Sequence, residues 1–147
     1  MSGGLLEFQF TTADFEGAWS VGRWIEDRRS ERTFQFVGLA TFAPGPDDAL
    51  VYHEDGRLQA EGMDAIRAER RYIWRFGGAD PIAVEFEDGR PFYAFDPLAT
   101  RPRATHVCDP DTYVITLDFG DWPDWRTVWG VTGPRKDMTI TTAYTRE

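Results

Sequence analysis

The stretch Phe34-Gln35-Phe36-Val37-Gly38-Leu39-Ala40-Thr41-Phe42 decides the fold class, because apolar residues recur in it at every second position. Side chains of a β-strand point alternately to its two faces, so this period places one set of residues on a single buried face. The same alternation returns at 71–76, opposite Arg71 and Arg75, and at 82–87, opposite Glu85 and Glu87. The buried sets are Phe34, Phe36, Gly38, Ala40 and Phe42; Tyr72, Trp74 and Phe76; and Ile82, Val84 and Phe86. Alternation dominates from Trp19 to the end and predicts an all-β protein of antiparallel strands, each with one solvent-facing and one buried face.

Short turn signals separate these runs. The tetrapeptide Glu-Asp-Gly-Arg occurs at 54–57 and again at 87–90, and Asp-Gly supplies the positive φ angles of a tight hairpin. Residues 108–112 predict another two-residue turn, with Pro110 at a position where its fixed φ fits type I geometry. Looser connections are expected at 44–48, 77–81, 96–103 and 133–136, and a short helical turn is expected at 11–16. Strands joined in this way form a meander, which needs none of the long crossovers that parallel strands require.

These turn signals separate about eleven candidate strands, a number that must change if the sheet closes into a ring. A meander of this length either stacks as a sandwich or closes into a barrel, and an antiparallel ring needs an even number of strands. The least regular stretch is 57–76, where Gly62-Met63-Asp64 is either a bulge within one bent strand or a turn between two. We therefore expect an up-and-down barrel of about 8–10 strands, whose interior is filled by side chains or holds one small ligand.

The two ends of the chain carry the evidence for closure. Gly17-Ala18-Trp19 opens the first strand, and Arg146 ends the last one. The first and last strands of an antiparallel barrel pair, so Trp19 and Arg146 should meet at the barrel floor, with the guanidinium over the indole face. In these features the chain resembles the calycin superfamily, whose lipocalin members carry Gly-x-Trp on the first strand and a packing arginine near the C-terminus. The resemblance implies a lipocalin-like barrel.

Five further motifs are spread over nearly the whole chain. They are Gly17-x-Trp19-x-x-x-Arg23, Tyr52-x-Glu54-x-Gly56, Arg71-Tyr72-x-Trp74, His106-x-Cys108-x-x-Asp111-x-Tyr113 and Gly133-Pro134-x-Lys136-Asp137. In this pattern the chain resembles a family of small bacterial proteins known only as a domain of unknown function. That resemblance implies no activity.

Composition predicts one globular domain over residues 1–147, because 41% of the residues are hydrophobic and 15% are aromatic. The formal net charge of -9 disfavours nucleic acid as a partner, since nucleic-acid binders replace counterions with Lys and Arg. Residues 1–6 lack a basic segment followed by an apolar run, and no stretch approaches the roughly 20 apolar residues of a membrane span. We expect a cytoplasmic protein without a membrane partner. The single cysteine, Cys108, excludes an internal disulfide and suits a reducing compartment.

The last two strands predict which residues lie at the open end of the barrel. If the last strand runs from Lys136 down to Arg146 at the floor, Lys136 starts at the opposite end and shares the parity of Arg146. The preceding strand, 124–132, rises with Trp129 on its apolar face. Trp129 should therefore finish near the same rim as Lys136.

The strand pair before these adds three more residues to that rim. Across the predicted turn at Asp109-Pro110, Cys108 should face Tyr113, and His106 should face Ile115, all on one side of the sheet. Five residues are thus expected to converge on the mouth of the cavity: His106, Cys108, Tyr113, Trp129 and Lys136.

This cluster supports three hypotheses of function. The first is a small-molecule-binding barrel, in which Lys136 neutralises an anionic group, Tyr113 and His106 fix orientation by hydrogen bonds, and Trp129 supplies a stacking wall. The second is a small barrel enzyme of the lyase or isomerase type that uses His106, Tyr113 and Lys136 as acid/base groups. The third is a structural or interaction protein whose barrel is filled by its own aromatics and whose outer surface binds another protein or a second copy, as a homodimer.

The remaining candidates are Arg23 and a cofactor. Arg23 shares the parity of Trp19, so it either holds a ligand or pairs with a carboxylate such as Glu54. His106-x-Cys108-Asp109 offers only two inward ligands, which is too few for a metal site, and a haem held by a single histidine is also disfavoured. No cofactor is expected.

Overall fold

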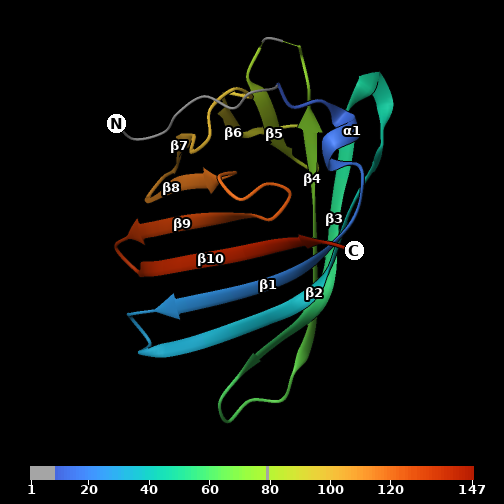
Figure 1. Ribbon diagram of the computed structural model, residues 1–147. Helices are drawn as coiled ribbons and strands as arrows, with labels where there is room; N and C mark the ends of the chain where they lie inside the picture. Colours follow the sequence, from blue (N-terminus) through green and yellow to red (C-terminus); the bar gives the residue numbers. More distant parts are fainter. Residues whose placement is uncertain (1–8, 79) are drawn as a thin grey trace.

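Ten antiparallel strands form one sheet that wraps round into a nearly closed barrel in the computed structural model, which describes residues 9–78 and 80–147 (Figure 1). The elements are α1 (Thr12–Phe15), β1 (Gly17–Asp27), β2 (Arg32–Pro44), a 3-10 turn (Pro46–Asp48), β3 (Leu50–Ala60), β4 (Ile66–Arg75), β5 (Ile82–Phe86), β6 (Pro91–Phe95), β7 (Arg103–Cys108), β8 (Asp111–Asp118), β9 (Trp125–Gly133) and β10 (Lys136–Arg146). Their order in the sheet is β6-β5-β4-β3-β2-β1-β10-β9-β8-β7. The predicted all-β, up-and-down barrel with a short N-terminal helical turn is confirmed.

The two ends of the chain lie side by side, as predicted. Trp19 on β1 is the register partner of Arg146 on β10, and the Arg146 guanidinium carbon lies 3.9 Å from the centre of the Trp19 ring. Arg146 also donates hydrogen bonds to the carbonyl oxygens of Asp14 (2.5 Å), which lies in α1, and of Glu16 (2.9 Å), which is the C-terminal cap of α1. Arg146 therefore ties β10, β1 and α1 together at the floor.

The gap in the barrel does not lie between the first and the last strand. Because β1 pairs with β10, the two unpaired edges of the sheet are β6 and β7, both from the middle of the sequence. The seam of the barrel runs between these two short strands.

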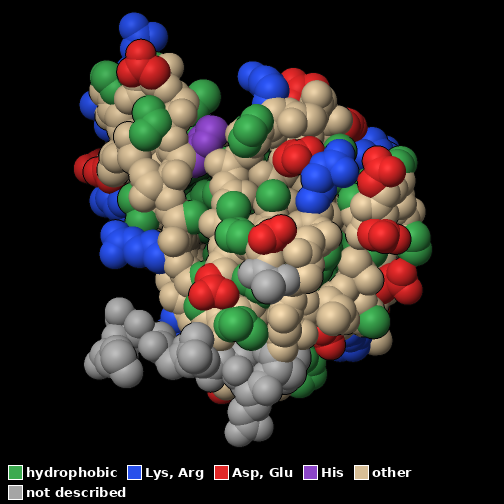
Figure 2. All heavy atoms as spheres, turned by 90° about the horizontal axis from the view of Figure 1, so that it is seen from above, with side chains coloured by type: hydrophobic (Ala, Val, Ile, Leu, Met, Phe, Trp, Pro, Cys, Tyr) green, Lys and Arg blue, Asp and Glu red, His purple; other side chains and the backbone are tan. Residues whose placement is uncertain are grey.

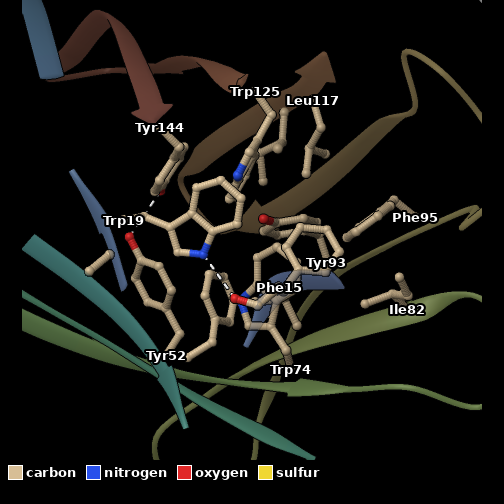
Figure 3. Packing of buried hydrophobic residues seen from close by; sticks show 14 of the residues in the cluster. Phe15, Trp19, Tyr52, Trp74, Ile82, Tyr93, Phe95, Leu117, Trp125 and Tyr144 are labelled. Atoms are coloured by element: carbon tan, nitrogen blue, oxygen red, sulfur yellow. Dashed lines mark hydrogen bonds between the residues drawn. The ribbon is translucent and has the colours of Figure 1, made fainter. Parts of the chain in front are cut away.

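Aromatic rings fill the floor half of the interior. The Trp19 indole nitrogen donates to the Phe15 carbonyl oxygen (2.8 Å), and the Trp125 and Tyr144 rings stack with centroids 3.8 Å apart (Figure 3). Stacked ring contacts of this kind add to the free energy gained from apolar burial. Aromatic side chains therefore close this half of the interior to a ligand.

One of the two Glu-Asp-Gly-Arg repeats is a turn and the other is not. At 87–90 the chain turns as predicted, with Gly89 at φ 91°. At 54–57 the prediction is wrong, because these residues lie inside β3. Gly56 faces Gly38 of β2, and a Cβ atom on Gly56 would lie 2.3 Å from the Val37 carbonyl oxygen. The glycine at this position permits a close approach of two strands, which local turn propensity does not reveal.

Two other local predictions are resolved by the register. Gly62-Met63-Asp64 lies in a turn between β3 and β4, which was one of the two alternatives. At the turn between β7 and β8, Cys108 pairs with Asp111, so Asp109-Pro110 is the predicted two-residue turn. The predicted pairing of Cys108 with Tyr113 is wrong by two residues, and His106 lies opposite Tyr113 instead of Ile115.

In the described part of the chain, no helix has the length and apolar character needed to cross a membrane.

Candidate functional site

A pocket of about 590 Å³ opens at the end of the barrel opposite the floor, and we call it the mouth pocket. It lies on the strands that flank the seam, β4 to β6 on one side and β7 to β9 on the other. Its lining residues are Arg70, Tyr72, Phe86, Arg90, Pro91, Phe92, His106, Val107, Cys108, Tyr113 and Trp129. In a view turned by 90° from Figure 1, the surface is notched, and a His side chain is visible in the notch (Figure 2). The volume falls within the range of about 300–1,000 Å³ that is typical of ligand sites.

Six of these lining residues carry rings, and the rings form two walls. Phe86 and Phe92 stack with centroids 4.7 Å apart and planes 22° apart, and Tyr72 lies 5.6 Å and 26° from Phe92 and 6.2 Å from Phe86, so the three rings form a triangular cluster. The opposite wall meets Phe92 nearly at right angles. Its rings are His106 (86°), Tyr113 (87°) and Trp129 (83°).

Beneath the rings lies a buried ionic cluster centred on Glu54, whose residue surface is only 2% exposed. Arg23 binds both carboxylate oxygens, at 2.6 and 2.8 Å, and its Nε donates to the Thr142 hydroxyl at 2.8 Å. Arg70 donates from Nε to the same carboxylate at 3.0 Å, and the Tyr52 hydroxyl donates at 2.5 Å. These charge-assisted bonds hold a carboxylate inside the barrel.

The partners of Glu54 decide its charge. Burial by itself raises the pKa of the Glu54 carboxyl, but the hydrogen bond from Arg23 and the charges of Arg70 and Arg23 bring that pKa below its ordinary value of 4.5. Burial lowers the pKa of Arg23, yet its bonds to Glu54 leave that pKa raised. Glu54 is therefore ionised near neutral pH. An arginine side chain in a protein carries its positive charge, so the two guanidinium groups around this one carboxylate leave an excess of one positive charge.

Arg70 lies at the inner end of the mouth pocket. A second, much smaller cavity of about 10 Å³ lies deeper in the barrel, and Arg70, Tyr72, Phe92 and Trp129 line both spaces. The outermost lining residues, including Arg90 and Cys108, are exposed. The excess positive charge thus belongs to the base of the pocket, and the barrel below that level is closed by side chains.

The structure brings together four of the six residues predicted to bind a ligand. His106, Cys108, Tyr113 and Trp129 all line the mouth pocket. Lys136 does not line it, and its Nζ lies 3.1 Å from the Asp111 carboxylate, a pair that raises the pKa of Lys136. Arg23 pairs with Glu54 and lies below the pocket, so of the two predicted alternatives the carboxylate pairing is the one found. Of the predicted acid/base set, His106 and Tyr113 line the mouth pocket and Lys136 does not.

Sequence reasoning missed the residues that β4, β5 and β6 contribute, of which Arg70 matters most. The signal was present, because Arg70 shares the parity of Tyr72 and Trp74, which were correctly placed on the buried face. The seam explains why Phe86 and Phe92 were missed, since nothing in the sequence showed that β6 would face β7. Among residues 9–78 and 80–147, no group of three His, Cys, Asp or Glu side chains is arranged to hold a metal ion.

Fold and pocket together define a calycin-like barrel with a ligand-sized pocket at its mouth, in agreement with the predicted resemblance. A family model matches residues 15–146, and the chain accordingly belongs to the family of unknown function DUF6314. A search of the curated proteins finds no match.

Two solved structures share this fold. One is the S-type phycobiliprotein lyase CPES from Guillardia theta, with a TM-score of 0.62, 7% sequence identity, and an alignment over 92% of this chain and 90% of that chain. The other is a protein of unknown function from the DUF3598 family of Nostoc punctiforme, with a TM-score of 0.64, 7% identity, and 95% of this chain aligned. This chain spans 50% of the length of that second protein. At such low identity the likeness establishes the fold alone.

Proposed function

We propose that this protein binds a small, partly apolar, anionic molecule in the mouth pocket. The observation that carries the proposal is the combination of a ring-lined pocket of about 590 Å³ with an excess guanidinium at its base. Apolar walls with a few fixed polar groups are the usual composition of a small-molecule site.

The sign of the charge supports an anion. The chain as a whole carries a formal net charge of -9, so its surface repels anions. The Arg23–Glu54–Arg70 cluster has the opposite sign. Arg23 and Glu54 are buried, so water screens that pair little, and the Arg70 side chain, 33% exposed, presents the excess charge to the pocket. A further support is that one barrel of this fold is a phycobiliprotein lyase.

Paired fluorescent probes test the proposal. Anilinonaphthalene sulfonate is a small apolar anion, and phenylnaphthylamine has nearly the same shape without the charge. We expect the sulfonate to bind with one site per chain and at least about tenfold more tightly than the amine, which corresponds to about 1.4 kcal/mol for one ionic hydrogen-bonded contact.

Two tryptophan substitutions on β7 locate the site. Cys108→Trp places a large ring at the exposed rim of the pocket, and we expect it to abolish sulfonate binding. Thr105→Trp adds the same ring to an exposed position on the same strand that does not line the pocket, and binding should be retained. The proposal is wrong if neither probe binds the wild-type protein, or if both variants lose binding equally while their thermal unfolding midpoints stay unchanged.

A further inference from the structure

We infer that the mouth pocket takes a flat aromatic acid and that the acid group enters first, to bind Arg70 at the pocket's base. This inference rests on the proposed function and adds to it the class of ligand and its orientation. It also reverses the sequence-based expectation, which placed the anion at the rim beside Lys136.

The Arg70 side chain has more hydrogen-bond donors than it uses. The only side-chain hydrogen bond of Arg70 within residues 9–78 and 80–147 runs from Nε to Glu54, so both terminal Nη groups remain available. A guanidinium with two free Nη groups is the usual bidentate partner of a carboxylate. Glu54 does not compete for them, because each of its two oxygens already accepts two hydrogen bonds.

The guanidinium of Arg70 is also held in a fixed position. Its central carbon lies 5.0 Å from the centre of the Trp129 ring and 5.5 Å from that of Tyr72. Cation–π contacts of this kind, together with the bond to Glu54, orient the Nη groups before a ligand arrives. Fixing the donor in advance reduces the entropy lost on binding.

The cations near the rim are already neutralised. Arg90 lies 2.7 Å from the Asp88 carboxylate, and its side chain is 76% exposed. Lys136 is paired with Asp111 outside the pocket. Water screens both of these surface pairs, so the strongest attraction for an acid group is at the inner end.

The walls select a flat ring over a flexible chain. Apart from the two arginines, Pro91, Val107 and Cys108, every lining side chain is a ring. The cluster of Tyr72, Phe92 and Phe86 and the perpendicular rings of the other wall offer both faces and edges, which an aromatic ligand uses fully. An acyl chain makes no ring–ring contacts and loses rotational freedom on binding.

Calorimetric titration with three small molecules tests the class. We expect naphthoate to bind at least tenfold more tightly than decanoate, which has the same acid on a flexible chain, and tenfold more tightly than naphthalene methanol, which has the same ring without the charge. If decanoate binds as well as naphthoate, the aromatic class is wrong while the proposed function stands. If none of the three binds, and anilinonaphthalene sulfonate fails as well, the proposed function is wrong and this inference falls with it.

Two arginine variants test the orientation. Arg70→Met should reduce naphthoate affinity at least tenfold, to the level of naphthalene methanol, and should leave the affinity for the alcohol unchanged. Arg90→Met should change naphthoate affinity by less than twofold. Glu54 keeps its two bonds from Arg23 in Arg70→Met, so the barrel should fold, and circular dichroism checks this. If that variant does not fold, Arg70→Lys serves instead, since it keeps the charge but lacks the fork, and it should lose part of the affinity.

The acid group itself provides the decisive signal. With an isotope label in the carboxyl carbon of naphthoate, NMR titration gives the pKa of the bound acid. A neighbouring guanidinium lowers that pKa. The pKa of bound naphthoate should be lowered in the wild type and in Arg90→Met. It should not be lowered in Arg70→Met, and it should be lowered less in Arg70→Lys. A lowering that survives the change at Arg70 and disappears in Arg90→Met would overturn the inference.

Discussion

Replacing Arg23 by methionine should destabilise the barrel by about 3 kcal/mol, close to the lower end of the 3–5 kcal/mol that breaking a buried ion pair usually costs. Arg23 is 7% exposed and Glu54 2% exposed, so the substitution leaves a carboxylate buried without its main partner. The lower end applies because Glu54 keeps the bonds from Arg70 and Tyr52. A domain of this kind has a total stability of about 5–15 kcal/mol, so the loss is a large share of it.

Urea unfolding followed by tryptophan fluorescence measures this change, and Arg67→Met is the matched control. Arg67 also binds a carboxylate with two hydrogen bonds, to Asp55 at 3.0 and 2.7 Å, but on the outer face of the barrel. That pair is exposed, so Arg67→Met should leave the unfolding midpoint almost unchanged. Equal midpoints for the two variants would refute the assignment of the Arg23–Glu54 pair as a buried structural element.

The pH dependence of the same variant has a defined sign. In the wild type the pKa of Glu54 is below its ordinary 4.5, so the stability it contributes is present above pH 4.5 and is lost as the pH falls through the lowered value. Without Arg23, burial favours the protonated acid. The difference in unfolding free energy between wild type and Arg23→Met should therefore shrink as the pH is lowered from 7 toward 4.

Three further substitutions have expected outcomes that differ in kind. Arg146→Ala removes the cation–π contact with Trp19 and two hydrogen bonds at the floor, and should lower the free energy of unfolding by about 1–2 kcal/mol in urea titration; an unchanged midpoint would count against the floor contact. Gly56→Ala forces a Cβ into the neighbouring strand and should cost about 1–3 kcal/mol, whereas Gly22→Ala, with nothing within 4 Å of the added atom, should fold with an unchanged melting temperature. Lys136→Met should leave the affinity for anilinonaphthalene sulfonate unchanged, because Lys136 does not line the mouth pocket. A tenfold loss of affinity would show that Lys136 belongs to the binding site.

The sequence was most informative where one physical rule acts over a whole strand. Period-2 alternation predicted an all-β protein, and closure of an antiparallel sheet limited about eleven candidate strands to 8–10. The pairing of Trp19 with Arg146 follows from the same closure. Parity also placed Tyr113, His106 and Trp129 on one inner surface, where the structure has them.

Predictions failed where a local signal was decided by distant residues. Asp55-Gly56 has turn chemistry, yet the close approach of β2 keeps it extended inside β3. Lys136 has the parity expected of an inward residue, but at the rim of the barrel its flexible side chain reaches Asp111 instead. The position of the seam, which brings β6 beside β7 and makes the pocket, depends on the whole sheet and has no signature in any one segment.

Mapping of amide chemical shifts by two-dimensional NMR during titration with anilinonaphthalene sulfonate tests the central claim most directly. A ligand site at the mouth of the barrel predicts saturable shifts at His106, Cys108, Tyr113 and Trp129 and little change at the floor around Trp19. Shifts confined to the floor or the outer face, or no saturable shifts at millimolar probe, would contradict it.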